Sequence, residues 1–137
     1  MSFRALAIQC LLLMTLVAGE GMAADLPDTI DRIRPSVVAV GTLMPIRRPQ
    51  AQFMGTGFVI GDGRMVVTNH HVIPELIDQA KKEQLAVFSG RGPRAKAHPA
   101  RIVRSDPDHD LVLLEISNGP LPAMSLAPAA VIREGEE

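Results

Sequence analysis

Residues 55–68 read Gly-Thr-Gly-Phe-Val-Ile-Gly-Asp-Gly-Arg-Met-Val-Val-Thr. Two short runs with β-forming residues, 55–60 and 65–68, flank a Gly-Asp-Gly-Arg turn, and Asp-Gly between such runs is a strong hairpin signal. The glycines on either side of Thr56 indicate a bulge or a close approach of other backbone. This stretch therefore predicts an antiparallel hairpin.

Further short elements surround the hairpin at regular spacing. A short helix is predicted over 28–34, where Pro35 ends it. Strands are predicted over 36–43, 85–88, around 100–103 and over 111–116, the last apolar enough to be buried on both faces. Residues 44–53 are predicted as a loop and 74–84 as a helix-compatible segment, while 117–137 are not expected to form a strand. Short strands at this spacing indicate an all-β sandwich or barrel.

Residues 1–23 have the pattern of a secretory signal peptide. Arg4 precedes an apolar run over 5–18, and Gly21-Met22-Ala23 offers small residues for cleavage after Ala23. The apolar run of about 14 residues is short for a membrane span, with an uncleaved anchor as the alternative. The protein is therefore expected to be exported, to the periplasm or outside the cell, without a membrane association after cleavage.

The remaining residues, 24–137, are predicted to form one modest domain. They contain no cysteine, since Cys10 lies in the signal, so an exported domain must be held by its core rather than by disulfides. The whole chain has 14 basic and 15 acidic residues and a net charge of −1. No basic block or aromatic platform favours nucleic acid as a partner. Tyr and Trp are absent, so the core is expected to be aliphatic.

Two stretches contain residues suited to nucleophilic catalysis. Thr68-Asn69-His70-His71-Val72 places His71 just past a strand, where a general base could meet a nucleophile. Asp110 opens the apolar strand at 111–116, where an aspartate could orient that histidine from a buried position. The plainer alternative for Asp110 is a strand-opening turn residue.

The neighbouring candidates carry weaker patterns. His70 is the rival for the base, and Asp106 and Asp108 beside Pro107 are interpreted as loop acids. A zinc site built from His70, His71, His109 and the aspartates is the second chemical hypothesis. Adjacent histidines on an extended chain point to opposite faces, which disfavours a shared ion, so no metal and no cofactor are expected. His98 is expected to be exposed.

Four segments of the chain resemble the bacterial HtrA/DegP type of trypsin-like serine protease. They are Pro35-Ser-Val-Val-Ala-Val40, which is similar to that family's first strand; Gly55-Thr-Gly-Phe-Val-Ile60, similar to its Gly-Ser-Gly-Phe-Ile-Ile strand; residues 68–72, similar to Thr-Asn-x-His-Val; and residues 106–114, similar to Asp-Pro-x-x-Asp-Leu-Ala-Val-Leu. In this order and spacing the four pieces are highly specific.

The resemblance implies a two-barrel fold, with His71 as general base, Asp110 as its orienting acid and a protein or peptide as substrate. The nucleophilic serine of such proteases lies on the second barrel. The serines at 89, 105, 117 and 125 lack the glycine context that the nucleophile requires. Residues 24–137 are therefore expected to form only the first barrel, left incomplete because its last strand would follow the Arg133–Glu137 turn. Such a chain would be inactive alone.

The alternative is an exported β-domain without catalysis. An incomplete barrel has an open edge, and such an edge could accept a strand from a peptide or a partner chain. On the protease interpretation, strand 111–116 would lack a neighbour and expose apolar surface, which predicts an unstable or aggregating chain. A monodisperse monomer that melts cooperatively would favour the alternative.

Overall fold

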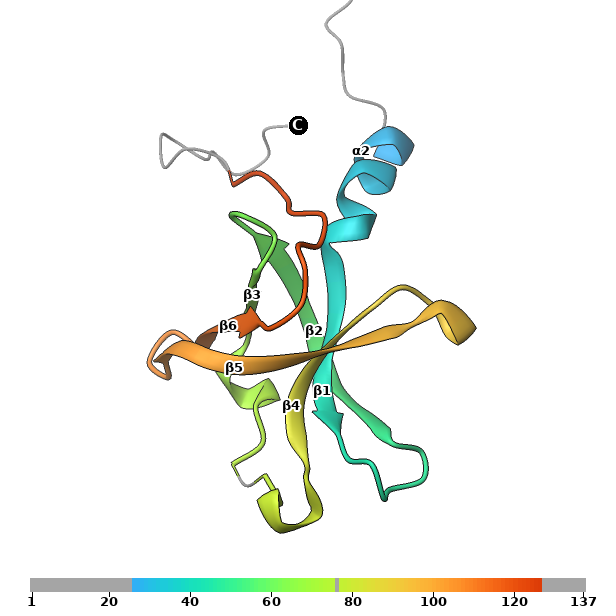
Figure 1. The fold of residues 1–137 in the computed structure, drawn as a ribbon. Coiled ribbons are helices and arrows are strands. Elements are labelled where there is room, and N and C mark those ends of the chain that lie inside the picture. Colours follow the sequence, from blue (N-terminus) through green and yellow to red (C-terminus); the bar gives the residue numbers. More distant parts are fainter. Residues whose placement is uncertain (1–25, 76, 127–137) are drawn as a thin grey trace, which may run out of the picture.

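The computed structural model describes residues 26–75 and 77–126, which form one short helix followed by six strands (Figure 1). The elements in chain order are helix α2 (Leu26–Ile33), the 3₁₀ turn η1 (Arg34–Ser36), strands β1 (Val37–Leu43), β2 (Ala51–Ile60) and β3 (Met65–Thr68), 3₁₀ turns η2 (His70–Val72) and η3 (Gln79–Lys81), strand β4 (Gln84–Ser89), 3₁₀ turn η4 (Gly92–Arg94), and strands β5 (Lys96–Asp106) and β6 (Leu111–Ile116). The predicted signal peptide, residues 1–23, lies outside the described residues.

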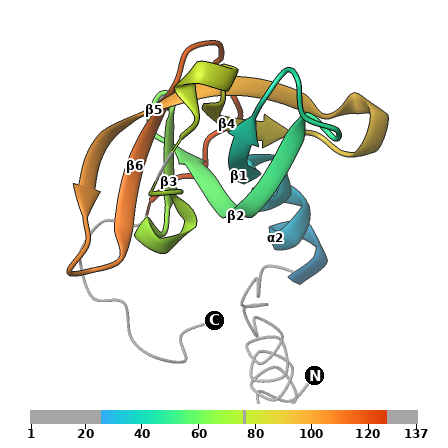
Figure 2. The ribbon, with the colours of Figure 1, turned by 90° about the horizontal axis from the view of Figure 1, so that it is seen from below.

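The strands close into an antiparallel barrel in the order β1–β2–β3–β6–β5–β4, and β4 pairs again with β1 (Figures 1 and 2). The all-β class with an N-terminal helix is confirmed. The expectation of an incomplete barrel was wrong, because β6 pairs with both β3 and β5. Each strand of the described residues has two neighbours, so this part of the chain has no open strand edge of the kind that the sequence interpretation expected.

Two strands are longer than their sequences indicated, and their extra length helps to close the barrel. Strand β2 begins at Ala51, inside the predicted loop, and residues 51–53 pair with residues 41–43 of β1 after a register shift at Val40/Gly41. Strand β5 begins at Lys96, and residues 96–99 pair with residues 86–89 of β4. The predicted hairpin is confirmed, with left-handed Gly61 and Gly63 in its turn.

The barrel interior is aliphatic, as the composition predicted. Its fully buried centre includes Val40, Val59, Val66, Val87 and Leu114, one from each of five strands. Burial alternates along β6, because its other face lies on the barrel's outer surface, where Leu111 is 45% exposed. The expectation that residues 111–116 would be buried on both faces was therefore wrong.

Residues 74–84 form no α-helix in the part of the segment that the structure describes. Only η3 is helical there, and Lys82 ends it in the left-handed conformation at φ 57°. The Glu83 carboxylate accepts hydrogen bonds from the Thr42 hydroxyl at 2.7 Å and from Arg47 Nη1 at 2.8 Å. These contacts hold Glu83 against the end of β1, and the left-handed Lys82 just before it ends the helical turn.

The segment after β6 is irregular over residues 117–126, as predicted, and the rest of that predicted tail lies outside the described residues. Its backbone donates from Leu121 to Gly63 O and from Met124 to Val59 O, so it runs beside the β2–β3 hairpin. Across the described ranges, no helix has both the length and the apolar character to cross a membrane.

Candidate active site

The pairing of β3 with β6 brings the two sequence motifs together. Thr68, the last residue of β3, pairs with Val112, the second residue of β6. The residues that follow β3 therefore lie beside the residue that precedes β6. His71 and Asp110, which are 39 positions apart in the chain, meet at this rim of the barrel.

Asp110 contacts His71 through both carboxylate oxygens. Oδ2 lies 2.6 Å from His71 Nδ1, and Oδ1 accepts a hydrogen bond from the His71 backbone N–H at 2.9 Å. The Asp110 backbone is left-handed, with φ 53°, a conformation in which aspartate is found more often than most residues. Its N–H donates to Pro107 O and its carbonyl accepts from His70 N–H. The carboxylate is thus fixed by its own backbone and by the histidine that it faces.

These contacts determine the protonation of the pair. The hydrogen bond from the His71 backbone N–H, followed by the one from its ring, holds the pKa of Asp110 below its ordinary value against the opposing effect of desolvation. An ionised carboxylate only accepts hydrogen bonds, so Nδ1 of His71 must donate. Nε2 of a neutral His71 then carries the lone pair that a general base needs.

The pair is open to solvent on one side. The side chains of His71 and Asp110 are 72% and 45% exposed. The sequence interpretation expected a buried aspartate, but the Asp110 side chain is only half-buried in the described barrel. The exposed side leaves room for a reacting group or another protein surface to approach His71.

A glycine in β2 lets the histidine turn sit close to the barrel. A Cβ built at Gly55 would lie 2.4 Å from Cγ2 and 2.8 Å from Cγ1 of Val72, the buried residue that follows His71. The neighbour at Gly55 is thus a side chain, whereas the predicted close approach of other backbone is found at Gly57, where a Cβ would lie 2.8 Å from Val67 O. Thr68 fixes the start of the same turn by donating from its hydroxyl to Thr56 O at 2.9 Å.

The rival residues lie nearby without joining the pair. His70 uses its backbone N–H, not its ring, to contact Asp110. Asp106 pairs instead with His109, whose Nδ1 lies 3.0 Å from Asp106 Oδ2 on the exposed β5–β6 turn. Among residues 26–75 and 77–126, no three His, Cys, Asp or Glu side chains gather as a metal site would require.

His98 is buried, contrary to the sequence interpretation, with 7% of its surface exposed. It lies in β5 opposite Val87 of β4, a register that the predicted strand at 100–103 did not include. Its Nε2 lies 2.8 Å from Ser89 Oγ and its Nδ1 lies 3.1 Å from Asn118 O. Because both ring nitrogens have partners, this histidine links three segments of the barrel.

Asn69 is the residue that the sequence interpretation missed. Its carboxamide nitrogen lies 3.1 Å from Asp110 O and 3.2 Å from Asp110 Oδ2. Its place inside the Thr-Asn-x-His-Val segment was the available signal, but the sequence alone does not show where its side chain turns.

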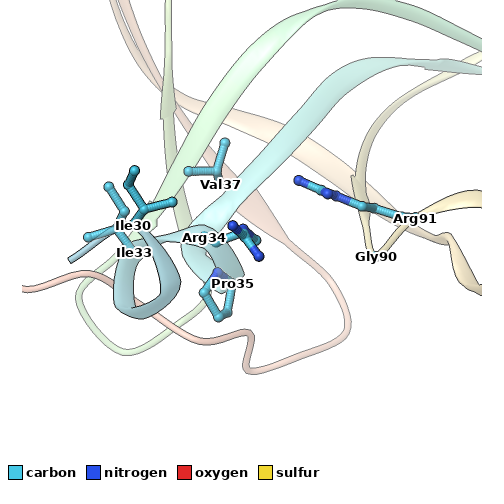
Figure 3. Close-up of a pocket in the computed structure, with 7 residues that line it drawn as sticks. All are labelled: Ile30, Ile33, Arg34, Pro35, Val37, Gly90 and Arg91. Carbon is cyan, nitrogen blue, oxygen red and sulfur yellow. The ribbon is translucent and has the colours of Figure 1, made fainter. Parts of the chain in front are cut away.

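Cavities in the described part of the chain lie on the outer surface. An apolar depression of about 220 Å³ over β3, β5 and β6 is lined by Val67, Arg104, Asp106, Leu111, Val112 and Leu113, and Leu111 follows Asp110 in the chain. A second cavity of about 460 Å³ lies away from the pair, between α2, η1 and the loop after β4. Figure 3 shows Ile30, Ile33 and Val37 grouped on one side of it and Arg91 reaching towards it from the other.

The fold and the paired motifs agree with a known family, because the model of the trypsin-like peptidase domain matches residues 55–137. The chain belongs to the trypsin-like peptidase family. The matched region begins at Gly55 beneath the histidine turn and includes both His71 and Asp110.

Curated members of the family place the chain with the HtrA type, as the sequence resemblance predicted. Serine protease HTRA1A of Danio rerio is 30% identical over 113 residues, 80% of this chain and 22% of that protein. A probable periplasmic serine endoprotease DegP-like of Chlamydia trachomatis serovar D is 30% identical over 92 residues, 66% of this chain and 17% of that protein. The chain thus spans about a fifth of the length of these trypsin-like relatives.

Two solved structures share the fold of this chain, and one of them is named as an HtrA-type protease. The protease AlgW is 25% identical with a TM-score of 0.58, covering 80% of this chain and 38% of that one. Deg5 is 27% identical with a TM-score of 0.56, covering 78% of this chain and 50% of that one. In both cases this chain matches half or less of the other structure, so it corresponds to one part of a larger peptidase fold.

Proposed function

We propose that this barrel supplies the general base and the orienting carboxylate of a serine endopeptidase active site. The 2.6 Å contact between His71 Nδ1 and Asp110 Oδ2 carries the proposal. It leaves Nε2 of His71 free to take the proton of a serine hydroxyl as that hydroxyl attacks a peptide carbonyl. His71 then returns the proton to the leaving amine, and Asp110 stabilises the imidazolium that forms between the two steps.

The serine and the oxyanion donors belong, on this proposal, to a second barrel that packs beside the His71–Asp110 pair. The apolar depression that Leu111 and Leu113 line begins at the residue after Asp110, and it supports a protein surface as the covering group. Without that serine the described barrel is inactive alone, because loss of the nucleophile from a Ser-His-Asp triad lowers kcat by about six decades.

The substrate and location follow from the relatives and remain proposals for this chain. The AlgW structure is of that protease with a decapeptide, which supports a peptide or protein substrate here. Several relatives are named as periplasmic serine endoproteases. Together with the signal-peptide pattern of residues 1–23, these names support export to the bacterial periplasm.

A serine-reactive fluorophosphonate and a barrel exchange together test the proposal. The chain itself, residues 24–137, should not be labelled by the fluorophosphonate. A chimera in which this barrel replaces the first barrel of the DegP-like relative should cleave casein. His71→Ala should then lower kcat by about 10⁶ and Asp110→Asn by about 10⁴, while the control Gln79→Ala, in an exposed turn, should not change it.

Two results would contradict the proposal. Stoichiometric labelling of the chain alone would show a nucleophile that the proposal excludes. An active chimera that keeps its kcat in His71→Ala would show that the histidine is not the base.

A further inference from the structure

We infer that Asn69 is a positioning residue, which holds the Asp110 carboxylate in the orientation that places the proton of His71 on Nδ1. The inference rests on the proposed function for its catalytic consequence, but the contact itself is a property of the barrel. Asn69 touches neither of the ring nitrogens of His71 in the described contacts and acts through Asp110.

The carboxamide of Asn69 meets Asp110 at two atoms. Its Nδ2 lies 3.1 Å from the carbonyl oxygen and 3.2 Å from Oδ2 of Asp110. A primary amide has two N–H donors, so it can serve both acceptors. Oδ2 is also the oxygen that lies 2.6 Å from His71 Nδ1. Asn69 therefore fixes the rotation of the carboxylate whose Oδ2 accepts the hydrogen bond from His71 Nδ1–H.

The left-handed backbone of Asp110 makes such support necessary. At φ 53° an L-residue is strained, and this conformation persists only where surrounding contacts determine it. The Asp110 carbonyl has two donors, the His70 backbone N–H at 3.1 Å and the Asn69 carboxamide at 3.1 Å. Asn69 thus supports both the strained backbone and the side chain that the backbone directs.

The usual role of an asparagine at this place is excluded by the contacts. Asn69 is the N-cap residue of η2, where an asparagine side chain ordinarily accepts a hydrogen bond from the first helical turn. Here its side chain makes no capping hydrogen bond. The carboxamide is turned away from the helix and towards Asp110, so capping does not explain the residue.

The tautomer of neutral His71 reports on this positioning without any need for activity. Nitrogen-15 shifts of the imidazole give the ratio of the Nδ1–H to the Nε2–H form in the chain itself. Asn69→Ala should lower that ratio about tenfold, the effect of losing one hydrogen bond to a charged group. Asn69→Ser, which keeps a hydrogen-bond donor at this position, should restore part of it. Gln79→Ala is the matched surface control.

Thermal unfolding separates positioning from a general structural role. Asn69 is exposed and the His70 backbone N–H still holds the Asp110 carbonyl, so Asn69→Ala should lower the midpoint only slightly and leave the chain folded while the tautomer ratio changes. In the casein-cleaving chimera, Asn69→Ala should lower kcat about tenfold and leave KM unchanged, because only the transition state uses the oriented pair. A ratio within twofold of the wild type in Asn69→Ala would overturn the inference.

The variant Asp110→Asn distinguishes the two possible failures. If the ratio responds to Asp110→Asn but not to Asn69→Ala, the His71–Asp110 pair stands and only the role of Asn69 falls. If the ratio responds to neither variant, the pair itself is not formed, and the proposed function loses its supporting contact as well.

Discussion

At the scale of single residues, the most unusual feature of the barrel is the conformation of Asp110. It combines a left-handed backbone with a carboxylate that accepts from the backbone and the ring of one histidine. Sequence reasoning could select Asp110 and His71, because each occupies a recognisable place at the end of a strand. It could not find Asn69, because a contact between two side chains depends on rotamers that no pattern of residue types determines.

The depressed pKa of Asp110 predicts a pH dependence of stability. Its pKa is lowered mainly by the hydrogen bond from the His71 backbone N–H. The stabilising contribution is therefore complete above the unfolded value of about 3.9 and is lost as the pH falls through the lower folded value. Urea unfolding of the wild type and of Asp110→Asn should give a difference in unfolding free energy that shrinks below about pH 4. A difference that grows on acidification would contradict the assignment.

The contact between Gly55 and Val72 predicts a second residue-level effect. Gly55→Ala should destabilise the chain by roughly 1–3 kcal/mol, because the new methyl group overlaps the Val72 side chain. Val72→Ala removes the two methyl groups that the new methyl group overlaps. The double variant should therefore lose less unfolding free energy than the sum of the two single losses. Denaturant unfolding of all four proteins measures this coupling. Strict additivity would show that the methyl group is accommodated elsewhere.

At the scale of elements, strand cores were predictable and strand ends were not. The hairpin at 55–68 and strand 111–116 follow from β-branched runs and a turn signal. The extensions of β2 and β5 contain Gln52, Lys96 and Pro99, which local propensity does not favour in strands, and they are strands because a neighbouring strand pairs with them. The helix expected over 74–84 does not form for a similar reason. Glu83 contacts Thr42 and Arg47, which lie far from it in the sequence, so no local pattern could show these contacts.

The two hydrogen bonds of the buried His98 predict that this side chain contributes to the stability of the barrel. It joins β5 to Ser89 at the end of β4 and to Asn118 after β6. His98→Ala should lower the unfolding free energy by about 2–4 kcal/mol, because it leaves a cavity and removes both hydrogen bonds. His109→Ala, which loses only an exposed pair with Asp106, should cost less than about 1 kcal/mol. Equal effects of the two substitutions, measured by chemical unfolding, would show that the His98 links do not stabilise the fold.

At the scale of the whole molecule, the family resemblance was sound, but the expectation of an unfinished barrel was not. The sequence pattern predicts where strands lie in the chain, but it does not predict which strands pair with each other. Closure depends on the pairing of β4 with β1 and on the extended strands that flank this pair. It places the His71–Asp110 pair on a complete barrel, so the geometry of the pair does not depend on a strand from elsewhere.

Closure also predicts that the chain from Ala24 onward folds cooperatively. The buried side chains of β1, β2, β3, β4 and β6 form one cluster, so loss of any strand exposes the others. The chain has no Trp or Tyr, so far-UV circular dichroism and buried methyl resonances are the two suitable probes of urea unfolding. Their transitions should coincide.

The same unfolding measurements should separate a buried leucine from an exposed one. Leu114→Ala, at a position with no exposure, should lower the unfolding free energy by about 2–5 kcal/mol. Leu126→Ala, at 62% exposure, should change stability by less than about 0.5 kcal/mol. Gradual transitions that differ between the probes would mean that the barrel needs a further surface to fold, and the covering group proposed beside Leu111 would then be structural as well as catalytic.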